Sequence, residues 1–132
     1  MRTQHKLTFQ LGYDFDSHPT TSILLFEEHA ARLASSISGG CTTSIKKGWW
    51  CPEGTQRRRR FDPLSAQSER TFEIELTCED HKLDQAYLDM QNGLASLAAE
   101  FMIETDWVHV SEVEIKGRHF SIASLNATLA AE

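Results

Sequence analysis

The sequence predicts an α+β domain in which one antiparallel sheet carries two helices on a single face. Apolar and polar residues alternate in four short segments, which is the period of a half-buried strand. Two longer segments repeat apolar residues every three or four positions, as an amphipathic helix does. These six segments follow one another in the order strand, helix, strand, strand, helix, strand.

The first strand and the first helix are separated by a turn-rich connection. Residues 7–11, LTFQL, alternate between apolar and polar side chains, which predicts a strand. After GYDFDSHPTTS, Pro19 and the three hydroxyl residues that follow it suit a helix start. The apolar stripe of the predicted helix 21–37 is Ile23, Phe26, Ala30, Leu33, Ala34 and Ile37. Gly39 and Gly40 end it, because glycine takes the left-handed C-terminal conformation at little cost.

Two further strands flank a long loop. Residues 41–46 alternate as a second strand, and residues 72–78, FEIELTC, form the clearest alternation in the chain. Between them, residues 47–68 are rich in Gly, Pro and Ser, so we expect a long hairpin loop whose ends extend the strands. Loops of this length in compact domains are usually functional or mobile.

The second helix is predicted from Asp80 as N-cap to Phe101. Its apolar stripe is Leu83, Tyr87, Met90, Leu94, Leu97 and Phe101. Gly93 inside it costs ~1 kcal/mol of helix stability relative to alanine. We therefore expect it to mark close packing on the sheet.

The C-terminal third is less regular. Residues 107–115 predict a fourth strand, but the apolar parity changes after Val110, so we expect a bulge or a fully buried stretch near Ser111. A turn at 116–118 then leads to a short fifth strand at 119–123. Residues 124–132 are predicted to be a frayed helix or a flexible tail.

This order, β-α-β-β-α-β with right-handed crossovers, predicts the split βαβ or ferredoxin-like arrangement with a short additional C-terminal strand. Both helices then cover one face of the sheet. The open face would carry Thr8, Gln10, Thr42, Ser44, Lys46, Glu73 and Glu75. This polar face is expected to meet solvent, a second subunit or a ligand.

Composition limits the partners. A chain of 132 residues predicts a single domain, 1–132, with one core. Thirteen basic and nineteen acidic residues give a net charge of −6, which opposes binding to duplex DNA or an anionic membrane. No segment has the ~20 apolar residues of a membrane span. Three cysteines without CxxC spacing are typical of a reduced protein, so we expect a cytoplasmic location.

Other candidate sites are weak. Glu73 and Glu75 occupy the open-face positions where an RNA-binding domain of this topology carries aromatic residues, which argues against RNA recognition. Asp14-x-Asp16-x-His18 lacks the glycine of a calcium loop, so a self-bonded turn is favoured over a metal site.

Catalytic candidates are equally sparse. Cys78 lies near His81, but it continues the apolar face of its strand and is predicted to be a core residue. His109 and Glu112 lack a converging nucleophile. We therefore predict no catalytic residue, no resident metal and no cofactor.

The segment KKGWWCPEGTQRRRR, from Lys46 to Arg60, contains the predicted ligand site. Two adjacent tryptophans extend the second strand, so one ring should join the core and the other should stand on the open face. An indole can stack on a nucleobase, and arginine offers phosphate a bidentate fork. The candidate ligand residues are Lys46, Lys47, Trp49, Trp50, Arg57, Arg58, Arg59 and Arg60. The alternative is a solvated basic loop that pairs with acidic residues of a neighbouring subunit.

The layout resembles small uncharacterised ferredoxin-like domains. The likeness lies in GGCTTSIKKGWW, where a G-x-T strand leads to G-x-W, and in the acidic strand, long helix and final V-x-V strand after it. The chain is also similar in size to small phage proteins that neutralise bacterial defence. Some of those sequester cyclic nucleotide signals in pockets between subunits, and this resemblance implies the same possibility here.

The sequence thus predicts a non-catalytic binding protein that captures a small anionic, nucleotide-like ligand as a homodimer or larger assembly. The first alternative is a protein-interaction module or inhibitor that docks on a partner enzyme. The second alternative is a small cytosolic enzyme that uses His81, His109 or the cluster of Asp14, Asp16 and His18.

Overall fold

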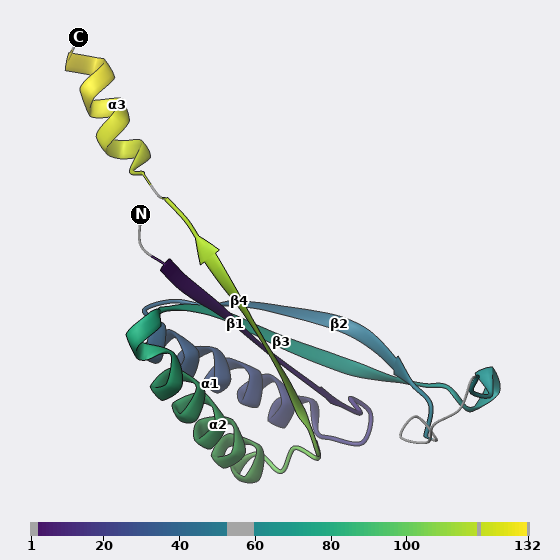
Figure 1. Ribbon diagram of the computed structural model, residues 1–132. Coiled ribbons are helices and arrows are strands. Elements are labelled where there is room, and N and C mark those ends of the chain that lie inside the picture. Colours follow the sequence, from purple (N-terminus) through teal and green to yellow (C-terminus); the bar gives the residue numbers. More distant parts are fainter. Residues whose placement is uncertain (1–2, 53–59, 119, 132) are drawn as a thin grey trace.

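The computed structural model describes residues 3–52, 60–118 and 120–131. The elements are β1 (Thr3–Tyr13), α1 (Thr20–Ser38), β2 (Thr42–Trp50), β3 (Gln67–Glu79), α2 (Leu83–Glu100), β4 (Val108–Lys116) and α3 (Ile122–Ala131). Helices α1 and α2 lie beneath the sheet, and α3 lies at the C-terminal end of the described chain (Figure 1). Short 3₁₀ turns, η1 (Pro63–Ser65) and η2 (Asp80–Lys82), precede β3 and α2.

The sheet has four strands in the order β2-β3-β1-β4, and every neighbouring pair is antiparallel. α1 and α2 lie side by side on one face of it (Figure 1). The α+β class, the antiparallel sheet and the placement of both helices on one face are therefore as predicted. The hairpin that joins β2 to β3 is shorter than the predicted loop 47–68, because both strands extend into it.

The core lies between the helices and the two central strands. Alternate side chains of β1 and β3 point towards the helices, and α1 and α2 cover them with their predicted stripes. The buried hydrophobic residues include Leu7, Phe9, Leu11, Ile23, Phe26, Ala30, Ala34, Phe72, Ile74, Leu76, Met90 and Leu94. Tyr87 departs from the prediction, since 42% of it is exposed at the margin of α2.

The two edge strands are not covered by the helices. β4 pairs with β1 in a continuous register from Thr3 with Lys116 to Leu11 with Val108, and almost all of its residues are exposed. The predicted bulge or fully buried stretch near Ser111 is therefore wrong. The apolar residues of β4 switch from one face to the other because neither face of this uncovered edge strand is buried.

The C-terminus is helical. The predicted fifth strand at 119–123 is wrong, since residues 120 and 121 lead directly into α3; residue 119 lies outside the described residues. Ser121 Oγ accepts a hydrogen bond from the Ser124 N–H at 3.2 Å, which caps the helix start. Residues 124–131 thus adopt the helical form that was one of the two expectations for them. α3 projects away from the sheet (Figure 1).

Gly93 packs against the other helix rather than against the sheet. A Cβ added there would lie 2.3 Å from Leu33 Cδ2 of α1. The glycine therefore lets α2 approach α1 closely. The helices of the described part of the chain include none that is both long and apolar enough to cross a membrane.

Candidate functional site

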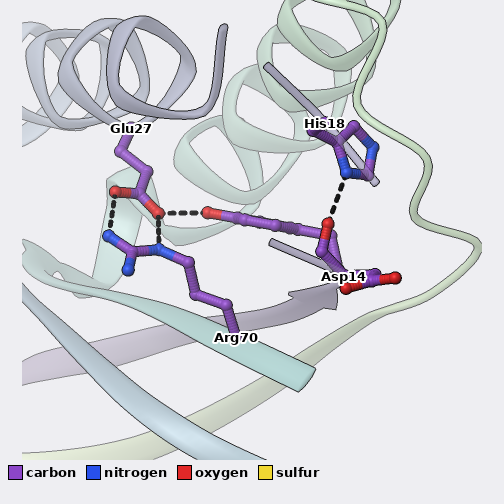
Figure 2. A network of polar contacts seen from close by, with 5 residues as sticks. Asp14, His18, Glu27 and Arg70 are labelled. Atoms are coloured by element: carbon purple, nitrogen blue, oxygen red, sulfur yellow. Dashed lines mark hydrogen bonds and ion pairs between the residues drawn. The ribbon is translucent and has the colours of Figure 1, made fainter. Parts of the chain in front are cut away.

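A partly buried ion pair joins the end of the sheet to α1. Arg70 of β3 donates from Nε and Nη2 to the two carboxylate oxygens of Glu27, each at 2.8 Å (Figure 2). The hydroxyl of Tyr13, the last residue of β1, donates to Glu27 Oε2. Burial and the hydrogen bond to Glu27 raise the pKa of Tyr13, so the phenol remains a donor. The three side chains satisfy one another, which indicates a structural clamp rather than a reactive centre.

The loop between β1 and α1 is a self-bonded turn. The Asp16 N–H donates to Asp14 Oδ1 at 3.0 Å, as the turn reading of this segment predicts. The Glu104 N–H donates to His18 Nε2 at 3.0 Å, so Nδ1 carries the proton and donates to the Asp14 carbonyl oxygen at 2.6 Å (Figure 2). Both ring nitrogens are engaged, so this imidazole has no lone pair left for a metal.

The predicted ligand residues divide between the two faces of β2. Pairing of Lys47 with Arg70 places Lys47 and Trp49 on the helix side, and Lys46 and Trp50 stand on the open side. The strand register thus separates Lys47 and Trp49 from Lys46 and Trp50.

Neither indole joins the core. Trp49 is 65% exposed and Trp50 is 45% exposed, so the expectation that one ring would be buried is wrong. The physical reason is that β2 is an edge strand whose end extends beyond the helices. The Lys47 ammonium lies 5.0 Å from the centroid of the Trp49 ring, which is cation–π geometry.

The remaining basic residues are differently placed. Lys46 Nζ pairs with Glu73 Oε2 at 2.9 Å on the open face. Arg60 is exposed at the end of the hairpin. The predicted positions Arg57, Arg58 and Arg59 lie outside the described residues.

A cleft of about 420 Å³ lies between the β1–α1 loop and the ends of β2 and β3. Its charged lining residues are Asp14, Asp16, Lys46, Lys47, Glu69 and Arg70. Arg70 is already neutralised by Glu27, and its guanidinium lies 5.1 Å from the centroid of the Phe15 ring. Lys47 is thus the basic group of this cleft that none of the ion pairs among the described residues neutralises.

A second hollow, of about 510 Å³, opens at the same end of the sheet and was not anticipated from the sequence. Trp50 of β2 and Trp107, just before β4, both line it, and Gly12 of β1 is among its lining residues. Its ionisable lining groups besides Tyr13 are Asp14, Glu69, Glu104, Asp106 and His109. Trp107 is two residues before His109, and residues two apart on a strand point to the same face of the sheet. The sequence could therefore have indicated that Trp107 stands on the open face.

The candidate nucleophile Cys78 is part of the core, as predicted, with 8% of it exposed. Burial, together with the nearby charge of Glu112, raises the pKa of its thiol. His81 instead lies 3.5 Å from Glu79. The pair therefore lacks the geometry and the thiolate that nucleophilic catalysis needs.

His5, at the opposite end of β1, lies between two carboxylates. Its Nε2 is 2.7 Å from Asp80 Oδ1, and its Nδ1 is 2.8 Å from Glu112 Oε1. The hydrogen bond to Asp80 raises the pKa of His5, although desolvation opposes it. The charged imidazole therefore favours the folded state.

The His5 contacts predict a pH-dependent stability. A folded-state pKa above the unfolded value means that the stabilisation is complete below about pH 6.5 and is lost as pH rises through the folded pKa. Wild-type Tm should therefore rise when pH falls from about 8 to about 6, and His5→Gln should remove most of this rise. His81→Gln is the matched control and should retain it. An unchanged pH profile in His5→Gln would contradict the assignment.

Comparisons with known proteins give only distant structural likenesses. No family model matches the chain, and no curated protein matches it. A hydantoinase/carbamoylase family amidase from Burkholderia multivorans is 16% identical, with 98% of this chain and 31% of that chain covered and a TM-score of 0.41. A putative amidohydrolase/peptidase from Burkholderia cenocepacia is 11% identical, with 84% and 27% covered and a TM-score of 0.42.

CutA from Synechococcus elongatus is 10% identical, with 84% of this chain and 81% of that chain covered and a TM-score of 0.41. The present chain spans less than a third of the length of the two hydrolases above. At these identities and TM-scores, the three structures do not inform the function of this chain.

Proposed function

We propose that this protein is a non-catalytic binding protein that captures a small anionic, nucleotide-like ligand at the β2 edge of its sheet. The observation that carries the proposal is the pair formed by Lys47 and Trp49. A largely exposed indole with an ammonium group 5.0 Å from its centroid offers a stacking surface and a cation on one face. The cleft of about 420 Å³ beside Lys47 is of a size that accommodates a small ligand.

We assign the βαββαβ order to the ferredoxin-like fold, and we place the protein in the cytoplasm as a homo-oligomer. We further propose that arginines from Arg57 to Arg60 donate to the phosphates of the ligand. Sequestration of a cyclic nucleotide defence signal, as the resemblance to phage proteins implies, is the biological role that we infer for such a binder.

A thermal-shift panel of mono-, di- and cyclic nucleotides tests this function. A ligand at 100 times its Kd stabilises the native state by ~2.7 kcal/mol, which raises Tm by several degrees for a domain of this size. The shift should be lost in Lys47→Met and Trp49→Leu, and it should fall in a variant with Arg57–Arg60 replaced by alanine. Lys6→Met and Trp107→Leu are matched controls and should keep it.

The alternative is a protein-interaction module, and the C-terminal helix favours it. α3 projects from the sheet (Figure 1), and residues 120–131 contain no charged side chain. Ile122, Leu125 and Leu129 are 67%, 49% and 66% exposed. Apolar side chains left uncovered in this way usually mark an interface. If no nucleotide shifts Tm and a protein is captured in pull-downs through α3, the alternative replaces the nucleotide proposal.

A further inference from the structure

We propose that the hollow on the open face, between Trp50 and Trp107, is a binding site for an organic cation that bears a substituted ammonium or guanidinium group. Trp50 stands on the face of the sheet opposite Lys47 and Trp49, although Asp14, Ser68 and Glu69 line both this hollow and the cleft beside Lys47. The inference uses Trp50, Trp107 and the carboxylates, and it does not depend on nucleotide binding.

The charged residues that line the hollow are acidic. Asp14, Glu69, Glu104 and Asp106 line it, whereas its described lining residues include no lysine or arginine. Within the part of the chain that the structure describes, no cationic side chain pairs with any of these carboxylates. Carboxylates gathered in this way repel one another and attract a positively charged ligand.

The aromatic lining defines which kind of cation fits. Trp107 is 79% exposed, and Trp50 is 45% exposed. The face of an indole attracts a cation, and indole is the most effective aromatic ring for this contact. Exposed indoles gain most from a cation that also has apolar surface to bury, as methylammonium and guanidinium groups do.

A bare metal ion is a poorer fit. Among the described residues, no group of three or more histidine, cysteine, aspartate or glutamate side chains is close enough to hold one. The carboxylates are instead distributed around a hollow of about 510 Å³, which is the size of a small organic molecule.

Gly12 leaves room for the Glu69 side chain to lie close to the backbone of β1. A Cβ at Gly12 would lie 2.2 Å from Glu69 Oε1, so any other residue there would displace this carboxylate. Glu69 can thus lie across β1 beside Gly12, where it contributes charge without filling the hollow.

The experiment follows the three indole N–H resonances of the ¹⁵N-labelled protein during titration with choline and with arginine methyl ester. The resonances of Trp50 and Trp107 should move at millimolar concentration, and that of Trp49 should not. 3,3-Dimethylbutanol, the neutral isostere of choline, should cause no comparable shift. A capped Ala-Arg-Ala peptide, titrated in parallel, distinguishes a free cation from an arginine side chain of a partner as the source.

Substitutions test the two halves of the site separately. Trp107→Leu is expected to weaken binding roughly 3- to 30-fold, the range of a cation–π contact. Glu69→Gln and Gly12→Ala should also weaken it, and added salt should reduce affinity. Trp49→Leu is the control and should bind as the wild type does. The proposal is overturned if neither cation moves the Trp107 resonance, if the neutral isostere binds equally well, or if Trp107→Leu leaves affinity unchanged.

Discussion

Glu27→Ala is expected to lower the free energy of unfolding by about 3 kcal/mol. Glu27 is 9% exposed, and its carboxylate accepts hydrogen bonds from Arg70 and Tyr13. Its removal leaves the phenol of Tyr13, which is 2% exposed, without a partner, and leaves the Arg70 cation unpaired. About a quarter of the Arg70 side chain reaches solvent. The expected loss of unfolding free energy therefore lies at the lower end of the range for a buried ion pair that loses one partner.

Urea unfolding at neutral pH measures this effect, with Glu28→Ala as the control on the same helix. Glu28 pairs with Arg32 one turn away on the exposed side of α1, so its loss should change stability by less than about 0.5 kcal/mol. Equal effects of the two substitutions would show that the Glu27 clamp adds no stability.

Phe26→Ala is expected to have the largest effect on stability, a loss of about 4 kcal/mol. The Phe26 ring is fully buried and contacts Tyr13 and Phe72 edge-on, with centroids 6.0 Å and 6.4 Å away. Alanine there removes the buried ring and leaves a cavity between α1 and the sheet, which the close-packed surroundings fill only in part.

The matched control for Phe26 is Leu24→Ala, at a position of α1 that is 52% exposed. Its effect should be below about 1 kcal/mol, since exposed apolar groups lose little on truncation. Urea denaturation should show a lower midpoint for Phe26→Ala at an unchanged m value. A small loss for Phe26→Ala would mean that α1 does not pack as described.

Phe26 and Glu27 are unsuitable positions for testing the ligand sites. Phe26 and Glu27 hold α1 against the end of the sheet where both candidate sites lie. Variants there would weaken binding indirectly, through loss of the fold. Lys47, Trp49 and Trp107 are exposed, so substitutions at these positions separate recognition from stability.

The sequence by itself determined the class of the fold and most of the core. The alternation at 7–11 and 72–78 and the stripes of the two helices arise because one face of each element is buried, and burial imposes a readable period. The turn at Asp14 and the core position of Cys78 followed from local rules of the same kind.

Where neither face of a strand is buried, the predictions made from the sequence were wrong. β4 and the end of β2 lie at sheet edges that no helix covers, so their parity did not report burial, and neither Trp49 nor Trp50 is buried. The strand expected at 119–123 gave way to a helix because its apolar residues do not pack against the sheet.

The composition of the candidate sites was decided by tertiary structure alone. Strand register separates Lys47 and Trp49 from Lys46 and Trp50, although all four are within five residues of one another. The same sheet brings Trp50 and Trp107, which are far apart in sequence, to one hollow with Glu69. Local periodicity specifies which way a side chain points, but only the pairing of strands specifies which side chains meet.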